Sequence, residues 1–308
     1  MAADRLHVAV LGPGGVGGFL GAMLARAGDE VLILASDSTS RAIAQDGLRV
    51  ESQKYGNFAV SVVTATRLTQ AVDACFVAVK ATHLQEAVDR VPATALGSGL
   101  VIPLLNGLEH VEFLRTVYPP AEVVAATIRI ETTRVAAGVI RQTSPFASIE
   151  MAASPSNRER VESIAAHLRA AGLHVKVRDD ELAMLWDKFA LLAPMALLTT
   201  HERANVGVIR TRRRADTIAL IGEVAAVAAA DGIHIDPQAA LALMDSVPES
   251  MESSMQRDQA AGRPTELDAL GGALLRRAAK AGIPAPVTRR LVDELQARNR
   301  PASSSTPA

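Results

Sequence analysis

Short apolar runs alternate with helical patterns along the first part of the chain. Apolar runs at 7–12, 30–36, 74–81 and 100–107 predict buried strands, because each is short and almost continuously hydrophobic. Residues 15–28 have helical spacing and end in a glycine, as helices commonly do. Strands that alternate with helices in this way predict a parallel sheet with right-handed crossovers.

The pattern changes after the segment 123–133. Segments 123–133 and 137–153 predict antiparallel strands that close one edge of the sheet. From about residue 180 onward the long apolar segments have helical spacing, with a linker near 177–181. We therefore predict an α/β fold class with an N-terminal Rossmann-type parallel sheet domain followed by an all-α helical domain. The predicted bounds are 1–180, 181–300 and a disordered tail at 301–308.

Composition narrows the class of protein. The 308 residues are 49% hydrophobic and 21% charged, which is typical of a soluble globular protein. A net charge of −1 and an aromatic content of 3% argue against a nucleic-acid partner. The basic run RTRRR at 210–214 is interpreted as a solvated helix face. We predict no membrane partner, because the sequence lacks an apolar stretch of about 18 residues.

The single cysteine, Cys75, lies in an apolar run. One cysteine cannot form a disulfide or a cysteine-based zinc site within the chain, which favours a reducing compartment. The first residues also lack the basic and apolar regions of a signal peptide. We predict a cytoplasmic protein without a bound metal.

Lysine is rare in this sequence, which has 27 arginines and 5 lysines. Lysine can release a proton in a protein and arginine cannot, so each lysine is a candidate for proton chemistry. Lys188 is the most unusual, because it precedes ten uncharged residues, 189–198. A lysine at a helix end that reaches toward solvent is the alternative interpretation.

A glycine-rich turn follows the first predicted strand and begins the first predicted helix. Gly12, Gly14 and Gly17 have the G-x-G-x-x-G spacing of a dinucleotide-binding loop, in the required strand–turn–helix context. Phosphates would lie at the helix N-terminus, where free N–H groups and the helix dipole favour anions. The predicted cofactor-binding residues of this turn are Gly12, Pro13, Gly14, Gly15, Val16 and Gly17.

The end of the second predicted strand bears on the choice of cofactor. Ser36 stands where a dinucleotide-binding protein would contact the ribose, and no acidic residue closes the strand. Ser36 with Arg41 could bind a 2′-phosphate, whereas Asp37 would oppose it. We favour NADP (NADPH) and leave NAD open.

Several segments together resemble the ketopantoate reductase family (2-dehydropantoate 2-reductases) over nearly the whole chain. The family implies reduction of a small 2-keto acid by NADPH, across a cleft between a Rossmann domain and a helical domain. The segments are GPGGVG (12–17), VKATHLQEAV with Lys80, PLLNGLEHVEFL with Asn106, WDKFA with Lys188, AADGI (229–233) and SSMQRDQAAGRPTELDALGG (253–272).

The resemblance implies roles for five side chains. Lys188 matches the catalytic lysine, and Glu266 matches a glutamate that binds the substrate hydroxyl or the cofactor ribose region. Ser254 matches a serine that holds the substrate carboxylate. Asn106 and Lys80 match residues that line the cofactor and the substrate. An ammonium group beside a ketone undergoing reduction can stabilise the oxygen's charge and donate the proton.

The sequence departs from the family at three positions. Leu192 and Ala196 replace asparagines four and eight residues after the lysine, and Met251 replaces an asparagine before the serine pair. Four- and eight-residue spacing places Leu192 and Ala196 on the helix face of Lys188. Fewer polar groups favour a more apolar keto acid. Pro194, in the same run, predicts a kink.

Three functions remain open at this point. The first is an NADP-dependent 2-keto acid reductase, with 2-dehydropantoate as the default substrate and pantoate as the product. The second is the same fold acting on another, more apolar oxo acid. The third is a non-catalytic NADP-binding sensor, which the presence of Lys188 and Glu266 opposes. The Ala-rich helices permit close packing within or between chains, so a homodimer is left open.

Overall fold

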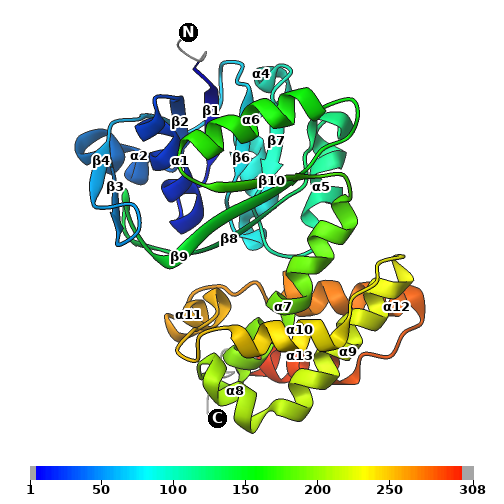
Figure 1. Ribbon diagram of the computed structural model, residues 1–308. Coiled ribbons are helices and arrows are strands. Elements are labelled where there is room, and N and C mark those ends of the chain that lie inside the picture. The colour runs from blue at the N-terminus through cyan, green and yellow to red at the C-terminus, as the bar shows by residue number, and fades with distance from the viewer. Residues whose placement is uncertain (1–4, 300–308) are drawn as a thin grey trace, which may run out of the picture. The chain divides into compact units, whose positions relative to one another are not determined.

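A computed structural model describes residues 5–299, which divide into two compact units (Figure 1). The first unit comprises residues up to Leu105 and Glu109–Leu185, and the second comprises Asn106–Leu108 and the residues from Trp186 onward. The division therefore falls within helix α7 (Glu181–Glu202), a little after the predicted position at residue 180. The predicted tail, 301–308, lies outside the described residues.

Five parallel strands form the first sheet, in the order β5-β2-β1-β6-β7. The parallel sheet of a Rossmann-type domain is thereby confirmed. Four of these strands match the predicted apolar runs, whereas β5 is too short to give a pattern. The bounds are β1 His7–Leu11, β2 Glu30–Leu34, β5 Val63–Ala65, β6 Ala74–Val77 and β7 Leu100–Pro103.

The antiparallel pair belongs to a second sheet, so the prediction that it closes an edge of the first sheet is wrong. β8 (Ala126–Ala136) and β9 (Val139–Ala152) are antiparallel, as predicted, and β9 continues into the order β10-β9-β3-β4. The remaining strands were not predicted. β3 (Leu48–Ser52) and β10 (His174–Arg178) alternate apolar and polar side chains, and β4 (Phe58–Val60) is only three apolar residues long.

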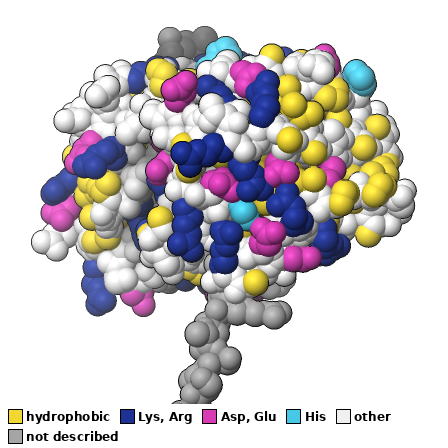
Figure 2. All heavy atoms as spheres, turned by 90° about the horizontal axis from the view of Figure 1, so that it is seen from below, with side chains coloured by type: hydrophobic (Ala, Val, Ile, Leu, Met, Phe, Trp, Pro, Cys, Tyr) yellow, Lys and Arg dark blue, Asp and Glu magenta, His cyan; other side chains and the backbone are white. Residues whose placement is uncertain are grey.

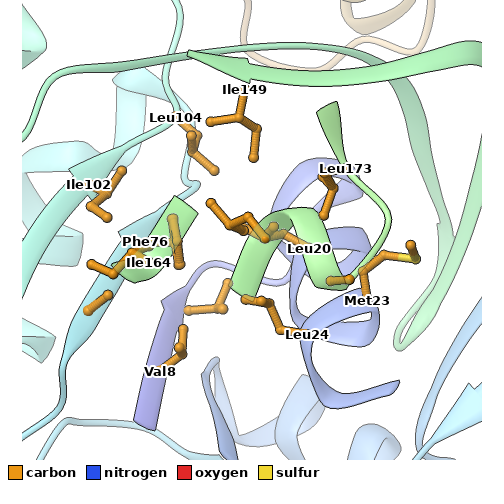
Figure 3. Packing of buried hydrophobic residues seen from close by; sticks show 14 of the residues in the cluster. Val8, Leu20, Met23, Leu24, Phe76, Ile102, Leu104, Ile149, Ile164 and Leu173 are labelled. Carbon is orange, nitrogen blue, oxygen red and sulfur yellow. The ribbon is translucent and has the colours of Figure 1, made fainter. Parts of the chain in front are cut away.

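Helix α1 (Gly15–Ala27) packs against both sheets of this unit. It contacts β1 and β2 of the first sheet and β3, β8 and β9 of the second. Figure 3 shows Leu20 and Leu24 of α1 in one apolar cluster with Phe76 of the first sheet and Ile149 of the second. The glycine-rich turn thus precedes a helix that is fixed on two sides.

Two further glycines explain how α1 approaches both sheets. A Cβ on Gly18 would lie 2.6 Å from the Ile140 side chain of β9, and one on Gly21 would lie 2.8 Å from the Ile33 side chain of β2. A larger residue at either position would force the isoleucine side chain or the helix to shift, since such contacts are too close for real Cβ atoms.

The other helices of the first unit are mostly short. The helical spacing of residues 82–91 predicts one helix, but three short helical segments are found there instead. The helical segments are α2 Asp37–Asp46, η1 Ala81–His83, α3 Leu84–Ala87, η2 Val88–Arg90, α4 Ala93–Leu96, α5 His110–Val117, η3 Pro120–Glu122 and α6 Arg158–Ala170.

The described part of the second unit is helical, as predicted. Seven segments follow α7: α8 Val206–Arg212, α9 Arg214–Ala230, α10 Pro237–Ser246, α11 Ser254–Ala260, the π-helical turn η4 Asp268–Gly272, α12 Ala273–Ala281 and α13 Pro286–Asn299.

The interpretation of RTRRR as a solvated face is wrong for Arg210 and Arg213, whose contacts are partly buried. Arg210 donates to the Met244 carbonyl at 2.8 Å, Arg213 donates to Glu202, and Arg214 forms an ion pair with Asp245. On the face shown in Figure 2, Lys and Arg side chains are interspersed with Asp and Glu side chains. Arg210 and Arg213 therefore join neighbouring helices, whereas the ion pair of Arg214 lies at the surface.

Helix α7 is long and apolar enough to cross a membrane, but 67% of its most apolar window is buried inside the protein. Its Trp186 and Phe189 rings meet edge to face, 5.5 Å apart, and both are buried. This burial is typical of a core helix in a soluble protein. The helix runs continuously through Pro194 to Glu202.

Candidate active site

The glycine-rich turn has the backbone geometry that its sequence predicts. Gly12 has a φ of 91°, which glycine adopts without strain. A Cβ on Gly17 would lie 2.3 Å from the Gly12 carbonyl oxygen and 2.9 Å from Ala78 Cβ. Gly17 therefore lets α1 begin directly against the turn, and the helix could not start there with a larger residue.

Gly14 leaves open space at the start of α1. It caps the helix with a φ of −72°, and a Cβ built on it would meet nothing within 4 Å. No acidic residue lies in the first turn of α1. Unpaired N–H groups at such a terminus attract anions, so these residues fit the pyrophosphate of a dinucleotide.

The other residues of the turn take different places. Pro13 is buried, and Val16 packs at the margin of the apolar cluster. Gly15 faces β8, where its Cβ would lie 2.8 Å from Thr132 Oγ1 and 2.9 Å from the Thr132 carbonyl oxygen. A close approach of two backbones therefore requires glycine at position 15.

Ser36 and Lys80 lie at the same edge of the first sheet as this turn. Leu11 at the end of β1 pairs with Leu34 of β2 on one side and Val77 of β6 on the other. Ser36 follows β2 and Lys80 follows β6. In the strand order, the chain passes from β1 to β2 in one direction and from β6 to β7 in the opposite direction. The edge between β1 and β6 is therefore the topological switch point of the sheet, where ligands of α/β sheets bind.

Contacts around these two residues differ. A Cβ on Gly12 would lie 2.7 Å from the Val79 side chain, so the chain just before Lys80 packs on the turn. Ser36 is exposed and caps α2, and its hydroxyl lies 3.2 Å from that of Thr39 and 3.3 Å from that of Ser38. A group of hydroxyls thus surrounds the predicted ribose position.

In the second unit, Lys188, Asn106 and Glu266 form one hydrogen-bonded row. Lys188 Nζ donates to Asn106 Oδ1 at 2.9 Å, and Asn106 Nδ2 donates to Glu266 Oε2 at 3.1 Å. Lys188 is half-buried, and Glu266 is 7% exposed. Three residues predicted separately are therefore brought together.

Donor and acceptor chemistry fixes the orientation of the central amide. An ammonium group can only donate hydrogen bonds, and an ionised carboxylate can only accept them. The amide oxygen of Asn106 must then face Lys188, and its nitrogen must face Glu266. Asn106 holds a cation and an anion at a fixed spacing, which a residue with only donors or only acceptors could not do.

The loop that carries Asn106 is seated on the turn that follows Glu266. Gly107 has a φ of 103°, and a Cβ on it would lie 2.6 Å from the Ala269 carbonyl oxygen. Ala269 lies in η4, a π-helical turn of a kind often found at functional sites. This contact explains why residues 106–108 belong with the second unit.

Ser254 is exposed at the first position of α11, and no hydrogen bond joins it to the row. Its neighbour Ser253 is 2% exposed and caps the helix by accepting from Gln256 N at 3.1 Å. The proposed carboxylate contact of Ser254 therefore stays a prediction, as do the individual roles of the other site residues.

The three residues that depart from the family pattern differ in their burial. Leu192 is half-buried one turn after Lys188, whereas Ala196 is 1% exposed. The expectation that both face a substrate is therefore wrong for Ala196, which packs in the helix core. Met251 is half-buried, and its carbonyl oxygen accepts from Val206 N at 2.9 Å.

One supporting contact was not predicted. Asp231, at the end of α9, accepts hydrogen bonds from Trp186 Nε1 at 3.1 Å and from Arg277 Nη1 of α12 at 2.6 Å. Trp186 lies two residues before Lys188, so these contacts hold the start of α7 against α9 and α12. The segment AADGI contained the signal, since it places an acid, Asp231, directly after the last residue of α9. Within residues 5–299, no group of three His, Cys, Asp or Glu side chains could hold a metal ion.

Two family models match the chain. Ketopantoate reductase PanE/ApbA matches residues 8–156, and the ketopantoate reductase PanE/ApbA C-terminal model matches residues 180–299. The chain is 31% identical over 304 residues to an uncharacterized oxidoreductase, YkpB, of Bacillus subtilis, covering 93% of this chain and 97% of the relative. It is 29% identical over 300 residues to a 2-dehydropantoate 2-reductase of Mycobacterium tuberculosis, covering 94% and 97%.

Solved structures agree with these matches. A PanE/ApbA family ketopantoate reductase from Ralstonia eutropha superimposes with a TM-score of 0.86 at 29% identity, covering 95% of this chain and 98% of that one. A D-mandelate dehydrogenase bound to NADH and anilino(oxo)acetate has a TM-score of 0.88 at 21% identity, which shows a shared fold. The chain therefore belongs to the ketopantoate reductase family and, like its relatives, is an oxidoreductase acting on CH–OH groups.

Proposed function

We propose that this protein reduces a small 2-keto acid to the 2-hydroxy acid with NADPH, and that Lys188 donates the proton. The observation that carries the proposal is the hydrogen-bonded row of Lys188, Asn106 and Glu266. 2-Dehydropantoate, reduced to pantoate, is the default substrate, because relatives at 28% and 29% identity carry the name 2-dehydropantoate 2-reductase.

Lys188 has the chemistry that this reaction requires. When bound, NADPH supplies the hydride that reduces the carbonyl carbon. As the carbonyl is reduced, negative charge builds on its oxygen, and an adjacent ammonium group stabilises that charge. Lys188 then transfers a proton from Nζ to the oxygen, which becomes the hydroxyl of the product. The amine regains its proton from solvent before the next turnover.

Asn106 and Glu266 act on Lys188 and the substrate. Asn106 Oδ1 accepts a hydrogen bond from Lys188 Nζ and so positions the ammonium group that donates the proton. The carboxylate of Glu266, which accepts from Asn106 Nδ2, is proposed to accept a hydrogen bond from a substrate hydroxyl. Ser254 is proposed to hold the substrate carboxylate.

The cofactor is proposed to be NADPH, bound by the glycine-rich turn and the start of α2. Hydroxyls gathered around Ser36 and the guanidinium group of Arg41 can donate to a 2′-phosphate, whereas an acid that binds the ribose hydroxyls of NAD does not close β2. Asp37, in the first turn of α2, works against the phosphate and moderates the preference.

A second candidate is a more apolar 2-keto acid. Leu192 and Met251 are both partly accessible and stand where the family pattern has amides. A pocket with fewer polar groups loses its preference for substrates with a hydroxyl. The fold alone does not choose between keto acids, since the D-mandelate dehydrogenase shares it.

The test measures oxidation of NADPH and of NADH with a panel of aliphatic, hydroxylated and aromatic 2-keto acids. The native protein is compared with Lys188→Ala and, as a matched control, with Lys280→Ala, an exposed lysine of α12. Loss of a general acid lowers kcat by about 10²–10⁴-fold, and the control should not change it.

Each outcome decides between the hypotheses. Turnover that survives Lys188→Ala would remove the proposed proton donor. Preference for ketopantoate over apolar keto acids would remove the second candidate. NADPH binding without turnover of any keto acid would favour the sensor. A homodimer, a cytoplasmic location and the absence of nucleic-acid and membrane partners stay predictions.

A further inference from the structure

A buried hydroxyl pair joins α7 to the segment that carries Ser254. Thr199 and Ser253 are hydrogen-bonded with 2.8 Å between their oxygens. Thr199 is 0% exposed and Ser253 is 2% exposed. A polar contact so completely removed from water is costly to leave unpaired, and it holds its two segments in one arrangement.

Thr199 lies on the same face of α7 as Lys188. The two are eleven residues apart, which is close to three turns at 3.6 residues per turn. Leu192 and Ala196 lie between them on this face, so Thr199 is the next polar side chain along it after the lysine. The face begins with the proposed proton donor and ends at the serine pair.

Backbone contacts hold the rest of this segment along the end of α7 and the start of α8. Gly207 N donates to the Glu249 carbonyl at 2.9 Å, and Val206 N donates to the Met251 carbonyl at 2.9 Å. A Cβ on Gly207 would lie 3.0 Å from Glu249 Cβ, so the start of α8 and the segment before Ser253 approach closely.

Gln256 provides a tie on the other side of Ser253. In the orientation that satisfies both ends of its amide, Gln256 pairs with the nitrogen and the oxygen of Ala204 at 3.3 and 3.1 Å. Four contacts thus hold residues 249–256 in place, made by Glu249, Met251, Ser253 and Gln256. Of these, the Thr199–Ser253 hydrogen bond is the one that reaches the face of Lys188. It is also the tie nearest to Ser254.

We propose that Thr199 is a positioning residue for binding of the keto acid, which acts by holding Ser253 and thereby Ser254 relative to α7. The inference rests on the proposed function and adds a residue to it. Without the Thr199 hydroxyl, Ser253 keeps its hydrogen bond from Gln256 N but loses the one that joins it to α7, so Ser254 is held less firmly relative to α7. The substrate carboxylate is then held less well, while Lys188 and its partners are unchanged.

The test compares Thr199→Val with Thr200→Val. Thr200 is the next residue of α7 and is 1% exposed, and its hydroxyl has no hydrogen-bond partner among the described residues. The two variants therefore remove the same group from the same buried helix. Only Thr199→Val breaks the contact with Ser253, and it also removes the hydrogen bond from Thr199 Oγ1 to the Met195 carbonyl within α7. Thr199→Ser keeps the hydroxyl and is the rescue variant.

The probes are ketopantoate and whichever 2-keto acid of the panel the native protein reduces best. For Thr199→Val we expect KM for the keto acid to rise about tenfold, with kcat changed less than about threefold and NADPH affinity unchanged. Thr200→Val should keep native constants, and Thr199→Ser should recover most of the loss. The melting temperature and the NADPH affinity report whether each variant is folded.

Two results would overturn the inference. One is that Thr199→Val has the same KM as Thr200→Val. The other is that Thr199→Val loses kcat, NADPH affinity and thermal stability together, which indicates a structural role alone. Failure of the proposed function looks different, because the native protein itself would then reduce no keto acid of the panel.

Discussion

The glycine-rich turn of the first unit and the Lys188 row of the second differ in how their residues come together. The turn consists of consecutive residues, 12–17, and its geometry comes from its own backbone. In the row, Asn106 lies 82 residues from Lys188 and 160 from Glu266. The turn therefore depends on which residues lack a Cβ, and the row depends on how three segments pack.

The largest expected effect is that of Gly17→Ala, which tests whether the turn depends on the missing Cβ. The added atom would lie 2.3 Å from the Gly12 carbonyl oxygen, and backbone cannot yield as a side chain would. We expect the free energy of unfolding of the first unit to fall by about 1–3 kcal/mol. NADPH affinity, measured by titration, should fall about 100-fold.

The matched control for this variant is Gly222→Ala in α9. A Cβ there meets nothing within 4 Å, and alanine favours a helix over glycine by about 1 kcal/mol. The control should bind NADPH as the native protein does, with equal or greater stability. Native affinity in Gly17→Ala would show that close packing of α1 on the turn is not required.

Asn106→Ala tests the row and has the next largest effect. It removes one hydrogen bond of Lys188 and one of Glu266 together, and with them the amide that spaces the two charged groups. Hydrogen bonds to charged groups contribute about 1.5–3 kcal/mol, so kcat/KM should fall by about 10- to 100-fold. Steady-state kinetics with the best keto acid measures this fall.

Asn57→Ala is the control for Asn106→Ala. Asn57 Oδ1 accepts from Ser52 N at 3.1 Å in a turn of the first unit, so this variant also loses an asparagine hydrogen bond. It should keep its native kcat/KM. An unchanged kcat/KM in Asn106→Ala would mean that Lys188 does not need the amide to be positioned.

The same contrast explains what the sequence could predict. The strands of the first sheet are continuous apolar runs, and the spacing of the glycines determines the geometry of the turn. Both could therefore be predicted from short stretches of sequence. β3 and β10 are short and alternate apolar with charged side chains. Both pair with β9, and Arg49 of β3, for example, lies opposite Val139 of β9. Each alternating run is only five residues long, and the pairing with β9 joins residues far apart in the sequence, so neither strand was recognised.

The site was predictable in its members and not in its arrangement. The scarcity of lysine and the family resemblance together indicated Lys188. That Asn106 bridges Lys188 and Glu266 depends on Gly107 packing against Ala269, which no spacing in the sequence reveals. Thr199 gave no signal, because a threonine in an apolar helix looks like any other core residue until its partner is known.

Gly14→Ala separates binding from folding within the turn. The new Cβ meets nothing within 4 Å, and a φ of −72° suits alanine, so the melting temperature should not change. The Kd for NADPH should rise about tenfold, because the methyl group occupies the space that the pyrophosphate approaches. An unchanged Kd would mean that this glycine only shapes the turn.

The last prediction is the absence of an effect: Cys75 should not react with a thiol reagent in the folded protein. Cys75 is the only cysteine of the chain, and its side chain is 0% exposed in β6. Burial in an apolar sheet raises the pKa of the thiol to about 12. At pH 8 the native protein should not react with a thiol reagent, and denaturant should release one reactive thiol.

Trp186, the only tryptophan, reports on the second unit, so the two residues follow the two units separately. Gly17→Ala should expose Cys75 at a lower denaturant concentration than that at which Trp186 fluorescence changes. Because the thiol of the folded state resists ionisation, stability should also fall as pH rises from about 9 toward about 12. A thiol that reacts in the native protein at pH 8 would show that the sheet below the glycine-rich turn opens readily, and the turn would then be less rigid than the row.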